Sequence, residues 1–201
     1  MMQALLLVAQ DMGKHLVLMT TMAIDGQGNI HHIVYLNNGV KITPTITAIQ
    51  GTYDLRYNVS GTLLGAVRWQ VDSNYFLYDH SGESLIPENT VSISKKSGKI
   101  YTVMSKISYT ANHQLDYTQF RLCAFAPDGR LLWEDSLAGQ TSPNNFNRIR
   151  DAVYDGNNAI YLSGEGNVNT LNLSGLRPSY PSSGVAPIDF IAKLDTNGKP
   201  L

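Results

Sequence analysis

Short apolar runs alternate with turn signals along the whole chain. The runs are rich in Val, Ile, Tyr, Thr and Phe, and many alternate between apolar and polar residues, which is typical of β-strands. Strands are expected at residues 4–10, 15–24, 30–36, 40–49, 63–69, 75–78, 90–94, 100–109, 119–125 and 159–163. Sustained 3.6-residue periodicity is absent from the sequence, so we expect little helix. The pattern predicts an all-β protein.

Turn signals that contain glycine recur throughout the chain between the expected strands. Glycine and asparagine adopt the positive φ angles of tight hairpins at low cost. The turn signals lie at residues 25–28, 37–39, 59–61, 80–82, 96–98, 127–129, 155–158 and 196–198. The chain is therefore expected to form successive antiparallel hairpins.

Two segments carry the same order of features. Residues 97–132 and residues 155–201 each contain a turn, a strand, a polar excursion and a hairpin with a glycine tip. The triplet Gly28–Ile30 also matches Gly98–Ile100 at a spacing of 70 (100 − 30). In the matching hairpins, Phe120, Leu122 and Ala124 share one strand face, as do Phe190, Ala192 and Leu194. One such unit cannot bury its own apolar face, so we expect repeated antiparallel blades that cover one another.

The hairpin tips set the expected number of blades. They fall at Gly61, Gly82, Gly129 and Gly198, with intervals of 21, 47 and 69 by subtraction. At about 45 to 50 residues per blade, the chain has room for roughly four blades in one domain over residues 1–201. A β-sandwich or a set of open twisted sheets remains as an alternative architecture.

Three excursions between strands are expected to carry contacts with other molecules. The longest covers residues 164–187 and is rich in Asn, Ser, Gly and Pro, and shorter ones cover residues 110–116 and 139–147. Long loops on a rigid scaffold commonly carry binding functions. We therefore expect protein partners or self-assembly through exposed edge strands and the 164–187 loop.

The C-terminal hairpins resemble a known repeat family. Residues 155–164 with 189–201, and the similar hairpin of residues 120–133, resemble the bacterial β-propeller repeats of extracellular and surface proteins. The resemblance covers the C-terminal half well and the N-terminal half loosely. It implies four-stranded antiparallel blades and a binding or structural platform, with no shared catalytic residues.

The last hairpin is expected to be incomplete at its C-terminal side. Its tip is Gly198 and the sequence ends at Leu201, which leaves few residues for a returning strand. Either the sequence was cut there, or residues 4–10 or a strand of a neighbouring subunit would complete that blade.

Composition narrows the classes of function. Charged residues make up 15% of the chain and the formal net charge is −1, so there is no long-range field to attract nucleic acid. The N-terminal apolar run is short and is followed by Asp11 and Lys14, which predicts neither a signal peptide nor a membrane span. The single cysteine, Cys123, lies in an apolar run and is expected to be a buried thiol.

Candidate chemistry is sparse. His31 and His32 are neighbours on an expected strand, so their side chains point to opposite faces and cannot chelate one ion. The segment with Asp151, Asp155, Asn157 and Asn158 is faintly similar to a Ca²⁺ loop, but an Asp-Gly turn explains it better. We expect no catalytic, cofactor-binding or metal-binding residues and no cofactor.

Other polar and aromatic residues have structural explanations. Glu134 and Asp135 would face apart on a strand, which does not suit a glycosidase pair. Trp69 and Trp133 are expected in packing between blades, and Tyr154, Tyr161 and Tyr180 are the candidates for stacking on a glycan.

The sequence thus favours a non-enzymatic structural or recognition module. Two settings are open: a surface or secreted assembly with a role in adhesion, or a virion component such as a phage tail or fibre protein. A glycan-binding or carbohydrate-active propeller is the remaining alternative.

Overall fold

A computed structural model describes residues 18–36, 38–71, 75–76, 91–109, 115–136, 148–167 and 187–201. These residues form strands and turns, with no helix among them. The strands are β1 (Leu18–Ile24), β2 (Ile30–Leu36), β3 (Gly51–Tyr57), β4 (Leu63–Arg68), β5 (Tyr75–Phe76), β6 (Val91–Ile93), β7 (Ile100–Tyr109), β8 (Leu115–Phe125), β9 (Leu131–Ser136), β10 (Arg148–Tyr154), β11 (Ala159–Asn167) and β12 (Pro187–Asp195). The expectation of an all-β, antiparallel fold is confirmed for this part of the chain.

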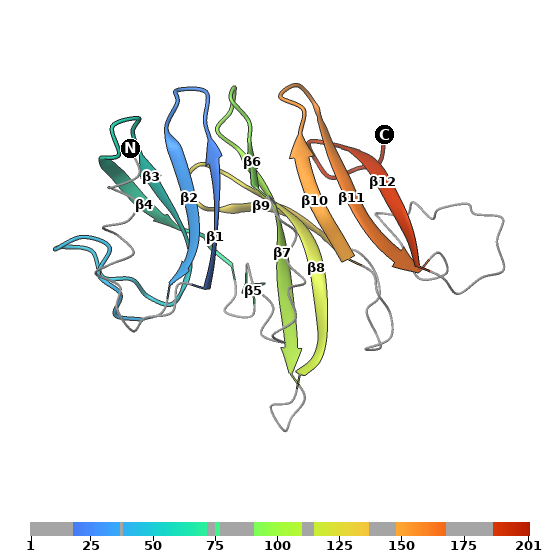
Figure 1. The fold of residues 1–201 in the computed structure, drawn as a ribbon, viewed down its shortest axis with the longest axis horizontal. Helices are drawn as coiled ribbons and strands as arrows, with labels where there is room; N and C mark the ends of the chain where they lie inside the picture. The colour runs from blue at the N-terminus through green and yellow to red at the C-terminus, as the bar shows by residue number, and fades with distance from the viewer. Residues whose placement is uncertain are drawn as a thin grey trace.

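The strands form three antiparallel sheets that lie side by side (Figure 1). Sheet 1 has the order β1-β2-β3-β4, and sheet 3 has the order β10-β11-β12. Sheet 2 contains β7-β8-β9, with β6 and the short β5 both paired to β7. Sheet 3 continues beyond β12, because Leu194 forms an antiparallel bridge with Pro200 and the Leu201 N–H donates to the Lys193 carbonyl.

The same pairing recurs at one position of every sheet. Ile30 pairs with Tyr57, Ile100 pairs with Phe125, and Ile160 pairs with Leu194. In each sheet, the partner of the isoleucine is the last residue before a tight turn. These pairs align the three sheets residue by residue, although the isoleucines are 70 (100 − 30) and 60 (160 − 100) residues apart.

Tight turns gather at one rim of the arrangement. The β1–β2, β3–β4, β6–β7 and β10–β11 turns lie at the upper ends of the strands in Figure 1. The connections from β2 to β3, from β7 to β8 and from β11 to β12 leave from the opposite rim. The turns that follow β3, β8 and β12 contain Gly61, Gly129 and Gly198, which have φ angles of 82°, 82° and 79°. Their spacings are 68 (129 − 61) and 69 (198 − 129).

Four of these turns are closed by the same side-chain hydrogen bonds. In each, one side-chain oxygen accepts the backbone N–H groups of the residues two and four positions later. The accepting residues are Asp25, Asn58, Asp155 and Asp195. Asp and Asn favour such turns because their short side chains satisfy backbone donors locally.

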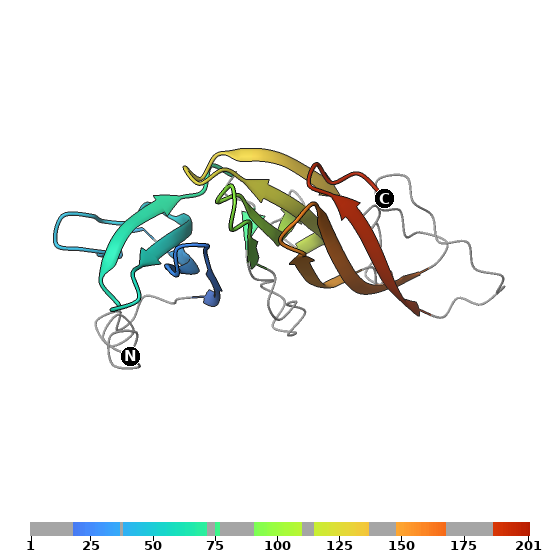
Figure 2. The same cartoon turned by 90° about the horizontal axis from the view of Figure 1, so that it is seen from above.

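Neighbouring sheets stack face to face through two apolar clusters. Ile33 and Trp69 of the sheet 1 region pack with Ile100, Met104 and Phe125 of sheet 2. The opposite face of sheet 2 packs on sheet 3 in a cluster made of Tyr101, Val103, Leu122, Ala124, Ala152, Ile160, Leu162, Ala192 and Leu194. Figure 2 shows the resulting row of sheets from above. The row does not close on itself within the described residues.

A third cluster covers the outer face of sheet 1. Val34, Leu36 and Tyr53 pack there with Val40 and Ala48, which belong to the connection between β2 and β3. The Tyr53 hydroxyl donates to the Ile49 carbonyl (2.9 Å), so the connection is held against this face. The first sheet therefore has a partial cover of its own.

The predicted strands agree with the structure in most of the described chain. The strands at 30–36 and 100–109 coincide with β2 and β7. The strand predicted at 40–49 is wrong, because this segment is a loop with a single bridge between Lys41 and Thr47. The excursions predicted at 110–116 and 164–187 are too long, since β8 begins at Leu115, β11 ends at Asn167 and β12 begins at Pro187.

Several other expectations concern residues outside the described part of the chain. The strand at 4–10, the tip at Gly82, the excursion at 139–147 and most of the 164–187 loop lie there. Three sheets are present in the described residues, where the hairpin tips predicted roughly four blades.

Substitution of Gly129 tests the close contact between sheets 1 and 2. A Cβ at Gly129 would lie 2.6 Å from the Arg68 carbonyl oxygen, whereas a Cβ at Gly156 would meet nothing within 4 Å. Both glycines have positive φ, so each alanine variant has a backbone cost of about 1–2 kcal/mol. We expect G129A to lose roughly 1–3 kcal/mol more than G156A, because overpacking adds to that cost. Equal losses in urea denaturation would contradict this contact.

The Asp155 and Asp195 turns predict sensitivity of the fold to acid. Hydrogen bonds from the Ala159 and Lys199 N–H groups lower the pKa values of these two carboxyls below the ordinary 3.8. Their contribution to stability is therefore present above pH 3.8 and is lost as pH falls through the lowered pKa values.

The D155N/D195N variant keeps the acceptor oxygens, as Asn58 does, and removes both titrating groups. We expect its free energy of unfolding to fall less than that of the wild type between about pH 4 and pH 2.5. N58D serves as the converse variant and should steepen that fall. Identical pH profiles for all three proteins would show that these carboxyls do not act in this way.

Candidate functional site

Within the described residues, the largest group of linked charged side chains lies on the face of sheet 1 that is turned toward sheet 2. His31 projects from β2, and Asp54 and Arg56 project from the same face of β3. Asp25 adds a second carboxylate from the turn between β1 and β2. The Asp54 side chain is fully buried, and His31 is nearly so. We call these four residues the charge cluster.

Hydrogen bonds connect the members of the charge cluster in a fixed order. His31 Nδ1 donates to the Asp54 carboxylate, at 2.9 and 3.0 Å from its two oxygens. Arg56 Nε donates to Asp54 Oδ2 at 2.7 Å. On the other side of the imidazole, His31 Nε2 lies 3.4 Å from Asp25 Oδ2. Asp54 thus has two positively polarised donors, which offset the cost of burying its charge.

Asp25 also closes the turn that positions it. It accepts hydrogen bonds from the Gln27 and Asn29 N–H groups and from the Asn29 amide. Burial tends to raise the pKa of Asp25, but these bonds and the one from His31 outweigh it and leave the pKa below 3.8. A negative charge is therefore retained beside His31.

Arg56 extends the charge cluster to the next sheet. Its guanidinium donates to the Pro127 carbonyl in the turn between β8 and β9 of sheet 2. Beside this contact, the Gln70 N–H donates to the Gly129 carbonyl (2.9 Å) in the same turn. The charge cluster is thus part of the contact between sheets 1 and 2.

A comparable contact joins sheets 2 and 3. Trp133 Nε1 of β9 donates to the Thr196 carbonyl at 3.0 Å. Thr196 and Pro127 occupy equivalent positions. Thr196 is the second residue of the turn after β12, and Pro127 is the second residue of the turn after β8. A Cβ at Gly198 would lie 2.9 Å from the Trp133 ring. In both junctions, a side chain of one sheet donates to the same turn carbonyl of the next.

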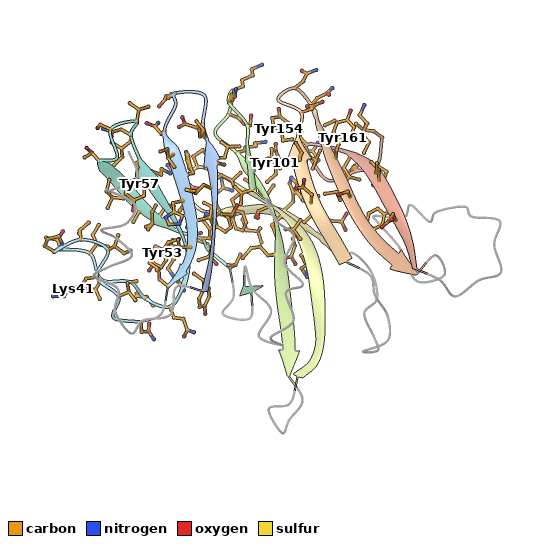
Figure 3. The ribbon with its side chains drawn as sticks, viewed as in Figure 1. Lys41, Tyr53, Tyr57, Tyr101, Tyr154 and Tyr161 are labelled. Atoms are coloured by element: carbon orange, nitrogen blue, oxygen red, sulfur yellow. The ribbon has the colours of Figure 1, made fainter. Side chains whose placement is uncertain are left out.

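Aromatic stacking strengthens both junctions. Trp69 lies on Phe125 with ring centroids 4.2 Å apart. The ring centroids of Tyr101 and Tyr154 are 5.1 Å apart (Figure 3). Burial, with the nearby Tyr154, raises the pKa of Tyr101 to about 12. Trp69 and Trp133 therefore pack between sheets, as the sequence predicted.

The chemistry available to the charge cluster is limited by its own contacts. An aspartate on Nδ1 is the arrangement that orients a histidine for proton transfer. A general base also needs its other nitrogen aimed at a reacting group. Here Nε2 faces the Asp25 carboxylate, and the imidazole is buried. The arrangement suits a clamp between sheets rather than proton transfer.

The two adjacent histidines point to opposite faces, as predicted. His31 belongs to the charge cluster, whereas His32 lies on the other face, where burial lowers its pKa below 6.5. Within the described residues, no three His, Cys, Asp or Glu side chains are placed to hold a metal ion. Asp155 Oδ1 accepts three backbone N–H groups of its own turn, which fits the predicted Asp-Gly turn rather than a Ca²⁺ loop.

The surroundings of Cys123 and Glu134 indicate structural roles for both side chains. Cys123 is fully buried as expected, and burial raises the pKa of its thiol, so the thiolate is disfavoured. Glu134 is exposed on β9 and forms an ion pair with Arg121 on the neighbouring strand β8.

Two of the three tyrosines suggested for glycan stacking, Tyr154 and Tyr161, lie on opposite faces of sheet 3 and do not form one platform. Tyr154 packs between sheets 2 and 3, and its hydroxyl donates to the Asn157 carbonyl (2.7 Å). Tyr161 lies on the opposite face of sheet 3, where it is exposed beside Lys193 (Figure 3). Tyr180 lies outside the described residues.

No protein-family model matches the chain, and the search of curated proteins gives no match. No helix in the described residues is long and apolar enough to cross a membrane.

Sequence reasoning missed the charge cluster. Its members lie far apart in the chain, since His31 and Asp54 are 23 positions apart. The signal was present in β3, where Asp54 and Arg56 alternate with Tyr53, Leu55 and Tyr57. In a strand with one apolar face, charges repeated on the other face indicate either solvent or a paired network.

Removal of the Asp54 carboxylate tests the charge cluster as a clamp. D54A leaves His31 and Arg56 without their shared acceptor, so we expect a loss of about 3–5 kcal/mol in the free energy of unfolding. D128A is the matched control, because Asp128 is an exposed turn residue whose carboxylate accepts a hydrogen bond from the Arg130 N–H. It should cost less than about 1 kcal/mol. A similarly small loss in D54A, measured by urea denaturation, would contradict the clamp.

Proposed function

We propose that this chain is a propeller-like module with a structural or recognition role and no enzymatic activity. Each sheet acts as one blade, and stacking of successive blades builds a rigid support for the connections at the rims. A stack of this kind presents loops to partners without a catalytic pocket.

The observation that carries the proposal is the use of the charge cluster. The His31–Asp54 pair is the arrangement in the described residues that most resembles catalytic chemistry. The second ring nitrogen of His31, Nε2, faces Asp25, and the Arg56 guanidinium donates to the Pro127 carbonyl of the next sheet. Charged groups placed in this way stabilise the junction of two blades.

The recurring alignment of the sheets supports the propeller-like part of the proposal. The three isoleucine pairs, the three glycine turns and the two turn-carbonyl contacts occupy matching positions. Repeated units with matching contacts to their neighbours are the general design of stacked repeat proteins.

We place the module in a surface or secreted assembly, on the resemblance of residues 120–133 and 155–201 to extracellular propeller repeats. A virion structural protein is the alternative setting, because stacked sheets would serve equally in an assembled particle. The glycan-binding alternative is less supported, since of the three suggested tyrosines the two that are described, Tyr154 and Tyr161, lie on opposite faces of sheet 3, and Tyr161 is the exposed one.

Fractionation of the source cells tests this setting. An antibody against the purified chain should detect the protein in the envelope, the secreted material or purified particles, and a cytosolic marker protein serves as the control. Detection in particles alone would select the virion setting. Detection only with the cytosolic marker would contradict both settings.

A further inference from the structure

One face of sheet 3 carries exposed apolar side chains in a cluster. Val153 lies opposite Tyr161 across β10 and β11, and Tyr161 lies opposite Lys193 across β11 and β12. Ile191 projects from the same face of β12, two residues before Lys193. The exposed fractions are 49% for Val153, 40% for Tyr161 and 82% for Ile191. We call the face of sheets 1 and 2 that is turned toward the following sheet their forward face. The exposed cluster lies on the corresponding face of sheet 3, which we also call its forward face.

The matching positions in the other two sheets are buried between sheets. Aligned on the isoleucine pairs, Tyr161 corresponds to Tyr101, which is 1% exposed, and to His31, which is 5% exposed. Ile191 corresponds to Leu122 and Asp54, each four residues before the turn, with exposed fractions of 2% and 0%. A following sheet covers these positions in sheets 1 and 2.

The opposite end of the row has the complementary feature. Met22 and Ile24 of β1 are 54% and 63% exposed on the face of sheet 1 that is turned away from sheet 2. Their counterparts in β6 are Val91 and Ile93, which are each 8% exposed and pack in the cluster between sheets 1 and 2. Sheet 1 therefore keeps apolar side chains at positions that meet a preceding sheet elsewhere.

The polar contact at the junctions also has its two halves at the two ends. Arg56, two residues before its turn, donates to the Pro127 carbonyl of the next sheet. Lys193 stands two residues before its own turn in sheet 3 and carries the same charge. Val59 holds the place of Pro127 in the turn after β3, and it is 64% exposed. The described residues thus carry a donor on sheet 3 and the matching turn on sheet 1.

We propose that the forward face of sheet 3 docks on sheet 1 of a second copy of this chain, head to tail. Val153, Tyr161 and Ile191 then cover Met22 and Ile24 of the partner, and Lys193 donates to the partner's Val59 carbonyl. Such an interface uses two different surfaces, so it closes into a ring or continues as a filament. This proposal deepens the proposed function and rests on its stacking of blades.

Two variants that each block one surface test the proposal on the full chain. I191E places a charge on the forward face of sheet 3, and I24E places one on β1 of sheet 1. We expect the wild type to sediment as a dimer or larger oligomer at about 50 μM, and each variant alone to sediment as a monomer. A mixture of the two variants retains one intact pair of surfaces and should form a heterodimer.

The matched control is L64E, which places the same charge on an exposed leucine of β4, the strand at the opposite edge of sheet 1 from β1. It should associate like the wild type, and thermal unfolding should show all three variants folded. A monomeric wild type would overturn the proposal, and so would loss of association in L64E. An I24E variant that still dimerises while I191E does not would overturn the head-to-tail arrangement in favour of two sheet 3 faces in contact. The fractionation result is independent of each of these outcomes.

Discussion

Burial of each sheet between its neighbours is the constraint on which the structure depends. The central sheet shows this most clearly, because five consecutive residues of β7, Ile100–Met104, are all buried. Alternate residues of this run belong to the cluster with sheet 1 and the cluster with sheet 3. In sheet 3, β12 instead alternates, with exposed Ile191 and Lys193 on one face and the partly buried Phe190 and buried Ala192 and Leu194 on the other. Whether one or both faces of a sheet are covered therefore determines whether its strands are apolar on one face or on two, and sheet 1 has two covered faces because the β2–β3 connection packs on its outer face.

Polar contacts fix how far each sheet is rotated and shifted against the next. Apolar packing alone tolerates small displacements, whereas a hydrogen bond from Arg56 or Trp133 to one turn carbonyl is satisfied in a single placement. The glycines of the turns contribute in the same way. At Gly129 and Gly198 there is no room for a Cβ, because residues of the neighbouring sheet lie directly against the glycine backbone.

Much of the fold was predictable from local patterns, and the errors have physical causes. Glycine turns and β-branched runs located β2 and β7 correctly. The sequence prediction that Leu194 and Ala124 lie on equivalent strand faces is wrong. When the sheets are aligned on their isoleucine pairs, Leu194 is equivalent to Phe125. Leu122 and Ala124 instead pack against Ala192 and Leu194 across the junction of two sheets. When both faces of a strand are buried, alternation no longer tells which face is which. The charge cluster escaped prediction because its pairings depend on the register of distant strands.

The separation of tight turns and long connections onto opposite rims gives the module two zones with different evolutionary freedom. At the turn rim, the turns that contain Pro127, Gly129 and Thr196 touch the adjoining sheet, so an insertion in them would push neighbouring sheets apart. Within the described residues, the recurring junction contacts lie at this rim and not at the strand ends from which the β2–β3, β7–β8 and β11–β12 connections leave. A change in the length of those connections is therefore expected to leave the spacing of the sheets unaltered.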